Sequence, residues 1–135
     1  MVKGFGAMTT PEYVKERLEF YSNNLKVPMP KHLILDEDEY AGVVIDEYND
    51  YYYANEIKSG HILGSNYDHG SVMFINLKKD RTAEEIEETC IHEILHTKYP
   101  NMPHGSQFYH YIKQIKEGNY NPKYGILRKF KDWIS

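Results

Sequence analysis

Two histidines and a glutamate within one short segment have the types and spacing that metal chemistry requires. His92 and His96 are four residues apart, and Glu93 directly follows the first of them. On a helix the two imidazoles lie one turn apart on the same face, where both can reach one zinc ion at about 2.0–2.1 Å. Glu93 lies beside them and can take a proton from water at such an ion. The segment therefore predicts a zinc site suited to hydrolysis.

A catalytic zinc ion needs a third protein ligand and an open fourth position. The downstream candidates are His104, His110 and Glu117. The helix expected after the prolines has an apolar face formed by Phe108, Tyr111, Ile112 and Ile115. His104 falls within that arc and in the expected first turn, where the helix dipole favours the neutral imidazole that a metal requires. His110 and Glu117 fall on the opposite side, so we predict one zinc ion held by His92, His96 and His104.

The segment around these histidines carries the signals of a helix. Thr82 and Glu85 have the spacing of a capping box, which predicts a helix from there to about Tyr99, where Pro100 follows. At helical spacing one arc is apolar: Ile86, Cys90, Ile91, Ile94 and Leu95. The two histidines point away from that arc, so the helix can pack on a sheet and still present them to a cleft. Cys90 is expected in the core and not as a nucleophile.

The remaining elements predict an α+β fold. Thr10 and Pro11 begin a helix whose apolar positions continue to Leu25. Short runs rich in Val, Ile and Tyr predict strands at His32–Leu35, Tyr40–Glu47, Tyr51–Ile57, His61–Tyr67 and Ser71–Leu77. Asn49–Asp50 is the expected turn between the second and third of these, and the acidic run Asp36–Glu39 is interpreted as a solvated turn. We expect an N-terminal helix, a mainly antiparallel sheet of three to five strands, and two helices that meet at the metal.

Composition narrows the class of protein. The chain has 135 residues, 41% hydrophobic and 27% charged, which is typical of a globular domain. A single cysteine, Cys90, excludes an internal disulfide and an all-cysteine zinc site. The first residues lack the apolar region of a signal peptide, and no stretch has the length of a membrane span. We therefore expect one domain over residues 1–135, in the cytoplasm and with no membrane partner.

Charge argues against a role in binding duplex DNA. The formal charge is −4, from 16 basic and 20 acidic residues. The basic cluster consists of Lys123, Arg128, Lys129 and Lys131, in an amphipathic segment that begins at Asn121. Four phosphate contacts on an acidic protein predict weak binding that depends little on salt.

The paired motifs resemble a known family. His92-Glu93-Ile94-Leu95-His96, followed after a short loop by His104-Gly105-Ser106-Gln107-Phe108, resembles the SprT-like zinc metallopeptidases, which carry HExxH and then HGxxF. The resemblance covers about Ser71 to Ile115. It implies a compact zincin-like domain, His92, His96 and His104 as zinc ligands, and Glu93 as the catalytic acid and base. The four-cysteine ribbon of longer members has no counterpart here, and the minigluzincin-like peptidases differ in using a glutamate as third ligand, which would be Glu117.

These observations favour a zinc-dependent peptidase that acts on a protein or peptide. Zinc would polarise the scissile carbonyl, while Glu93 would activate water and pass its proton to the leaving amine. The substrate could add as a strand at a sheet edge, for which Ser71–Leu77 is the candidate. Two other classes stay open: an endoribonuclease-type zinc hydrolase, in which the glutamate of the motif is lacking, and a non-catalytic zinc module that binds a partner.

Overall fold

The computed structural model of the protein describes residues 10–78 and 80–120. The chain divides into two compact units, Met1–Met102 and Pro103–Ser135. Within the described residues, the first unit contains four helices and three strands, and the second contains one helix. The α+β class is therefore confirmed.

The sheet of the first unit has three strands, β1 (His32–Ile34), β2 (Gly64–Tyr67) and β3 (Val72–Ile75). Their order is β1-β3-β2, with β1 parallel and β2 antiparallel to β3. The expected strands at these three places are confirmed, but the sheet is mixed where a mainly antiparallel one was expected. The central strand is β3, so the expectation that Ser71–Leu77 forms a free edge is wrong. The edge strand next to it along the chain is β2.

Two of the expected strands are helices. The segment predicted as a strand at Tyr40–Glu47 lies in α3 (Glu37–Tyr48), and the one at Tyr51–Ile57 lies in α4 (Tyr51–Lys58). Valine, isoleucine and tyrosine favour strands, but this preference is weak and is overridden by local capping and by packing. Here both segments bury one helical face.

Caps at both ends explain why these segments are helical. The Asp36 carboxylate accepts a hydrogen bond from the Glu39 amide at 2.9 Å, and Asp50 accepts one from the Tyr53 amide at 3.0 Å. Each aspartate thus satisfies an amide of the first helical turn, as an N-cap residue does. Asn49 ends α3 in the left-handed conformation, with φ of 56°. The acidic run is therefore a helix start and not a solvated turn, and its charge is favourable at that end of the helix dipole.

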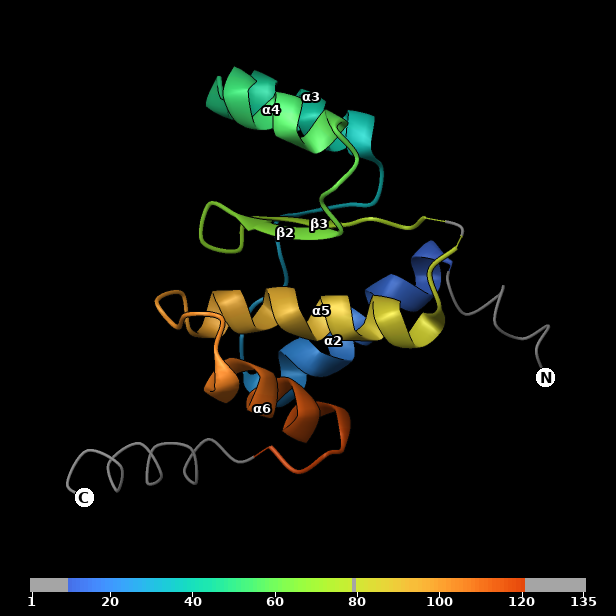
Figure 1. Ribbon diagram of the computed structural model, residues 1–135, viewed down its shortest axis with the longest axis vertical. Coiled ribbons are helices and arrows are strands. Elements are labelled where there is room, and N and C mark those ends of the chain that lie inside the picture. The colour runs from blue at the N-terminus through green and yellow to red at the C-terminus, as the bar shows by residue number, and fades with distance from the viewer. Residues whose placement is uncertain (1–9, 79, 121–135) are drawn as a thin grey trace. The chain divides into compact units, whose positions relative to one another are not determined.

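Helices cover both faces of the sheet (Figure 1). The α3–α4 pair lies on one face, and α2 (Pro11–Leu25) and α5 (Ala83–Lys98) lie on the other. The core beneath α3 and α4 contains residues that are at most 3% exposed: Ile34, Tyr40, Ala41, Val44, Ala54, Ile57, Val72 and Phe74. The sheet therefore serves as a platform against which α5 is held.

The first described helix, α2, is as expected from its sequence. Thr10 caps it, and its buried side chains recur at helical spacing: Val14, Leu18, Tyr21 and Leu25. Tyr21 donates a hydrogen bond of 2.6 Å to the Glu87 carboxylate on α5, and Arg17 donates one of 3.2 Å to the same oxygen. These contacts hold α2 against α5.

The second unit contains α6 (Ser106–Lys116), which Gly105 precedes as the N-cap residue. Of the expected apolar face, Phe108, Tyr111 and Ile115 are buried as predicted, and Ile112 is partly buried. The helix begins two residues after His104, so the expectation that His104 lies in its first turn is wrong. The amphipathic segment from residue 121 and its basic cluster lie outside the described residues. None of the described helices is long and apolar enough to cross a membrane.

Candidate metal centre

The helix that carries the motif begins as its sequence predicts. The Thr82 hydroxyl accepts a hydrogen bond from the Glu85 amide at 3.1 Å, and the Glu85 carboxylate accepts one from the Thr82 amide at 2.9 Å. This reciprocal capping box fixes where α5 starts and therefore which face each later residue occupies. The expected apolar arc is at most 1% exposed at every position: Ile86, Cys90, Ile91, Ile94 and Leu95.

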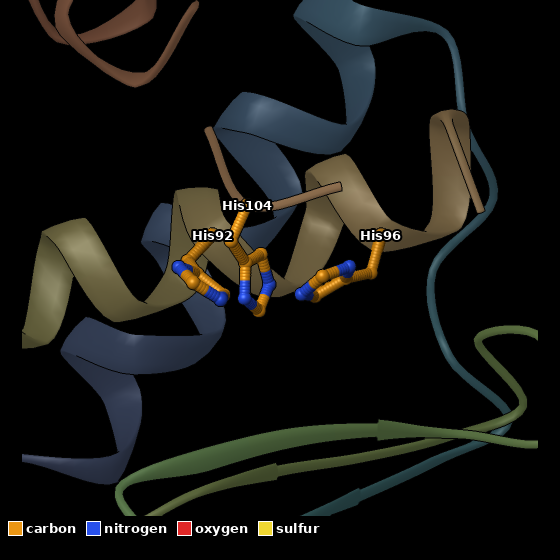
Figure 2. A group of neighbouring side chains, drawn as sticks. All are labelled: His92, His96 and His104. Atoms are coloured by element: carbon orange, nitrogen blue, oxygen red, sulfur yellow. The ribbon is translucent and has the colours of Figure 1, made fainter. Parts of the chain in front are cut away.

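His92 and His96 lie on successive turns of α5, and Figure 2 shows both side chains projecting from the same side of the helix. At helical spacing this side lies away from the apolar arc. Their ring centroids are 4.8 Å apart, with 69° between the ring planes. Both side chains are partly buried. The helix thus holds two imidazoles side by side on residues that are not fully buried, which is the arrangement that two ligands of one ion need.

Glu93 is only 5% exposed, although it is a carboxylate on the same turn as His92. Burial without a compensating charge raises its pKa to about 8. A carboxyl group in this range can exchange a proton near neutral pH, which is the property of a general acid or base. Its main-chain carbonyl accepts a hydrogen bond of 2.7 Å from Asn66 on β2.

His104 is exposed and lies in the segment before Gly105. Its ring centroid is 4.9 Å from that of Phe108. Within the described residues, one group of at least three histidines, cysteines or carboxylates could hold a metal ion, and it comprises His92, His96 and His104. One ligand atom of each lies within 4.8 Å of the other two (Figure 2).

The other residues considered from the sequence do not enter this group. His110 is partly buried on α6, and Glu117 is exposed at its C-cap. Cys90 is fully buried, and desolvation raises the pKa of its thiol to about 12. A thiol in this state is neither a good nucleophile nor a good metal ligand, so its place in the core is confirmed.

Comparison with protein families adds a separate line of evidence. The model of the WLM domain matches residues 34–133, which is most of the chain. The chain belongs to the WLM domain family. This domain is zinc-metallopeptidase-like and is related to the SprT-like proteins. The match therefore supports the broader resemblance seen in the sequence but does not confirm the SprT-like family itself. No curated protein and no solved structure matches the chain.

The donor set of this WLM domain fits zinc. Three imidazole nitrogens and one open position are the set found in catalytic zinc sites, whereas calcium and magnesium prefer oxygen ligands. Tetrahedral coordination at 2.0–2.1 Å places ligand nitrogens about 3.4 Å apart. The separation of up to 4.8 Å between the three histidines is within reach of small rotations about their side-chain bonds. The histidines present could therefore hold one zinc ion.

The contact between β2, an edge strand of the WLM domain, and Glu93 was not predicted from the sequence. Asn66 on β2 donates to the Glu93 carbonyl, and Gly64 on the same strand lies against the Glu93 side chain. Arg81 donates to the carbonyl of Leu63 at 3.2 Å and also to the Thr89 hydroxyl, so it connects the start of β2 to α5. A glycine within a strand often marks a close backbone approach, and this signal could have drawn attention to Gly64.

Proposed function

We propose that this WLM domain is a zinc-dependent peptidase, of the SprT-like type, that hydrolyses peptide bonds in a protein or peptide. One observation carries the proposal: a group of three histidines that could hold a metal ion includes His92, and the buried carboxylate of Glu93 directly follows it on α5. His92, His96 and His104 would hold one zinc ion. When bound, zinc supplies Lewis acidity that polarises a carbonyl and makes water easier to deprotonate.

Glu93 acts as the general base and then as the general acid. It takes a proton from the attacking water and passes it to the amine of the departing chain, so that the carboxylate is regenerated in each cycle. Burial under β2 favours this role because a desolvated carboxylate is a stronger base than one in water. Glu93 directly follows His92 on α5, so the helix places the base beside one of the proposed zinc ligands.

The edge of β2 is the surface on which an extended substrate would dock. The Asn76 amide donates to the Leu63 carbonyl at 2.9 Å, across the pair of strands. Hydrogen-bonded and non-hydrogen-bonded pairs alternate in an antiparallel ladder, so Ser65 bonds toward β3, while Gly64 and Asn66 turn their main-chain groups to the open edge. A peptide strand can therefore pair with two residues that adjoin Glu93.

The direct experiment is digestion of an unfolded protein, such as denatured casein, by the zinc-reconstituted chain. We expect new N-termini by mass spectrometry, and loss of cleavage after zinc is removed by a chelator. Glu93→Gln should keep the metal and lose hydrolysis by about 10²–10⁴-fold, because it removes the base and no ligand. Glu56→Gln, an exposed position on α4, is the matched control and should cleave like the wild type.

Two outcomes would replace the proposal. Cleavage of single-stranded RNA with no cleavage of protein would move the chain to the endoribonuclease type. A zinc-loaded protein that hydrolyses neither polymer would support the non-catalytic, partner-binding module.

A further inference from the structure

The inward-facing residues of β2 meet a single stripe of α5. Thr89, Glu93 and Thr97 are spaced by four residues and therefore lie one above another on the helix. Asn66 donates from its side-chain amide to the Glu93 carbonyl at 2.7 Å and to the Thr97 hydroxyl at 2.6 Å. This pair of hydrogen bonds fixes the strand to the middle and the C-terminal part of the stripe.

The contact between β2 and the stripe of Thr89, Glu93 and Thr97 is called the seam. Gly64 makes the closest approach along it. A Cβ atom at Gly64 would lie 2.5 Å from Cγ2 of Thr89, 3.0 Å from Oε2 of Glu93 and 3.4 Å from Cγ of Glu93. The first distance is shorter than any real carbon–carbon contact, and the second requires the carboxylate to give way. Strand and helix can therefore lie this close only because position 64 has no side chain.

The repeat distances of the strand and the helix place the contact of Gly64 at the turn of α5 that carries Glu93. Two residues of a strand advance about 6.7 Å, and four residues of a helix advance about 6 Å. Successive inward positions of β2 consequently meet successive turns of α5: Gly64 faces Thr89 and Glu93, and Asn66 faces the turn of Glu93 and Thr97. The strand and the stripe stay in register along their shared length.

Gly70 closes the far end of the seam in the same way. It follows the strand in the turn before β3, with φ of +89°, and its Cβ would lie 2.7 Å from Oγ1 of Thr97. Both its backbone conformation and its surroundings exclude a side chain. The seam thus has a glycine near each end and the Asn66 amide between them.

We propose that Gly64 is a positioning residue for Glu93: the absence of a side chain lets the edge strand lie directly against the carboxylate and fixes where that carboxylate sits. The same residue presents its main-chain groups to the open edge, where a substrate strand would pair. One backbone position therefore sets both the register of the peptide and the location of the base. The catalytic consequence depends on the function proposed above, whereas the contact with the Glu93 side chain does not.

The competing explanation is that Gly64 only relieves crowding with Thr89. The substitution Thr89→Ser distinguishes this explanation from the positioning of Glu93, because it removes Cγ2 and keeps the hydroxyl that Arg81 contacts. In the double variant Gly64→Ala with Thr89→Ser, the contact at 2.5 Å is gone and the contact with the Glu93 carboxylate remains. Gly42→Ala on α3 is the matched control, since a Cβ there meets nothing within 4 Å.

The kinetic experiment measures kcat and KM of the full-length, zinc-loaded variants on a peptide that the wild type cleaves. We expect the double variant to bind one zinc ion and to lose kcat by about 10-fold, with KM changed less than about threefold, because a carboxylate pushed aside by a few tenths of an ångström is a less well placed base but still permits binding. Thr89→Ser alone and Gly42→Ala should match the wild type. Wild-type kcat in the double variant would overturn the proposal.

A second measurement needs no activity and keeps the inference distinct from the proposed function. The measurement uses metal-free protein in which Thr89→Ser is always present. Adding Gly64→Ala should lower the urea midpoint. The same addition should lower the midpoint less when Glu93→Ala is also present, because the side-chain atoms that clash are then absent. A crystal structure of the double variant should show the Glu93 carboxylate displaced. Equal midpoint losses in both backgrounds, or an unmoved carboxylate, would refute the role of Gly64 even if the wild type proves active.

Discussion

Replacing Glu93 by glutamine should stabilise the metal-free protein at neutral pH, at the same time as it removes the base. In the folded protein burial raises the pKa of this carboxyl group from 4.5 to about 8. Between these two values the folded protein keeps a proton that the unfolded chain has released. The free energy of unfolding of the wild type must therefore fall as the pH rises through this window.

The size of the effect follows from the two pKa values. Each tenfold change in an acid constant is worth about 1.4 kcal/mol, so the ionised Glu93 costs about 5 kcal/mol well above pH 8 and about 3 kcal/mol at pH 7. Below pH 4.5 the group is protonated in both states, and the cost vanishes. Glutamine has nearly the same shape and no charge, so the variant escapes this cost over the whole range.

Urea denaturation of chelator-treated protein measures the difference directly. At an m value of about 2 kcal/mol/M, the Glu93→Gln midpoint should exceed that of the wild type by about 1.5 M at pH 7 and by nearly nothing at pH 4.5. Subtracting the two proteins cancels the titration of every group that does not interact with Glu93, and Glu56→Gln controls for loss of a charge. A difference that does not change between pH 5 and pH 8, or a variant less stable than the wild type at pH 7, would refute this reasoning.

Three further outcomes are expected. His104→Ala should remove most of the affinity for zinc while His110→Ala leaves it unchanged, which titration with a competing chelator would measure; equal affinity in both variants would exclude His104 as a ligand. Thr82→Ala should lower the free energy of unfolding by about 1 kcal/mol, because it breaks the capping box of α5, and an unchanged urea midpoint would contradict this. Binding of labelled duplex DNA at about 150 mM salt should be weaker than micromolar, since the formal charge is −4; a submicromolar and steeply salt-dependent affinity would overturn this expectation.

The elements that position the motif could be read from the sequence because their signals are local. The capping box at Thr82, the spacing of the apolar residues and Pro100 together defined α5 and its two faces. Strands at the places of β2 and β3 were also predicted, from the residue types of His61–Tyr67 and Ser71–Leu77. Signals of this kind depend on neighbours within four residues, which is the range that a sequence pattern reports.

The α3–α4 pair shows where the prediction of secondary structure from local patterns failed. Tyr51 and the following tyrosines favour a strand by residue type, whereas Asp50 before them caps a helix. The burial of Ala54 and Ile57 at helical spacing decided the outcome, and this depends on packing against the sheet. The acidic run at Asp36 carried the correct signal, but it was given the commoner interpretation of a solvated turn.

The contacts of Glu93 were beyond the reach of local patterns. The motif predicted that Glu93 adjoins the histidines, but β2, the strand that lies against its buried side chain, is almost thirty residues earlier in the chain. The close approach at Gly64 depends on the register between a strand and a helix, and no spacing within either element encodes it. A site residue can therefore be named from sequence while its electrostatic state cannot.

X-ray absorption spectroscopy of the zinc-loaded protein tests the central claim most directly, because it reports the atoms around the metal. The three-histidine centre predicts one zinc ion with three imidazole nitrogens and one oxygen that does not come from the protein, all at about 2.0–2.1 Å. In His104→Ala, one imidazole contribution should disappear. A shell that contains sulfur at about 2.3 Å, or four protein ligands with no open position, would contradict the account.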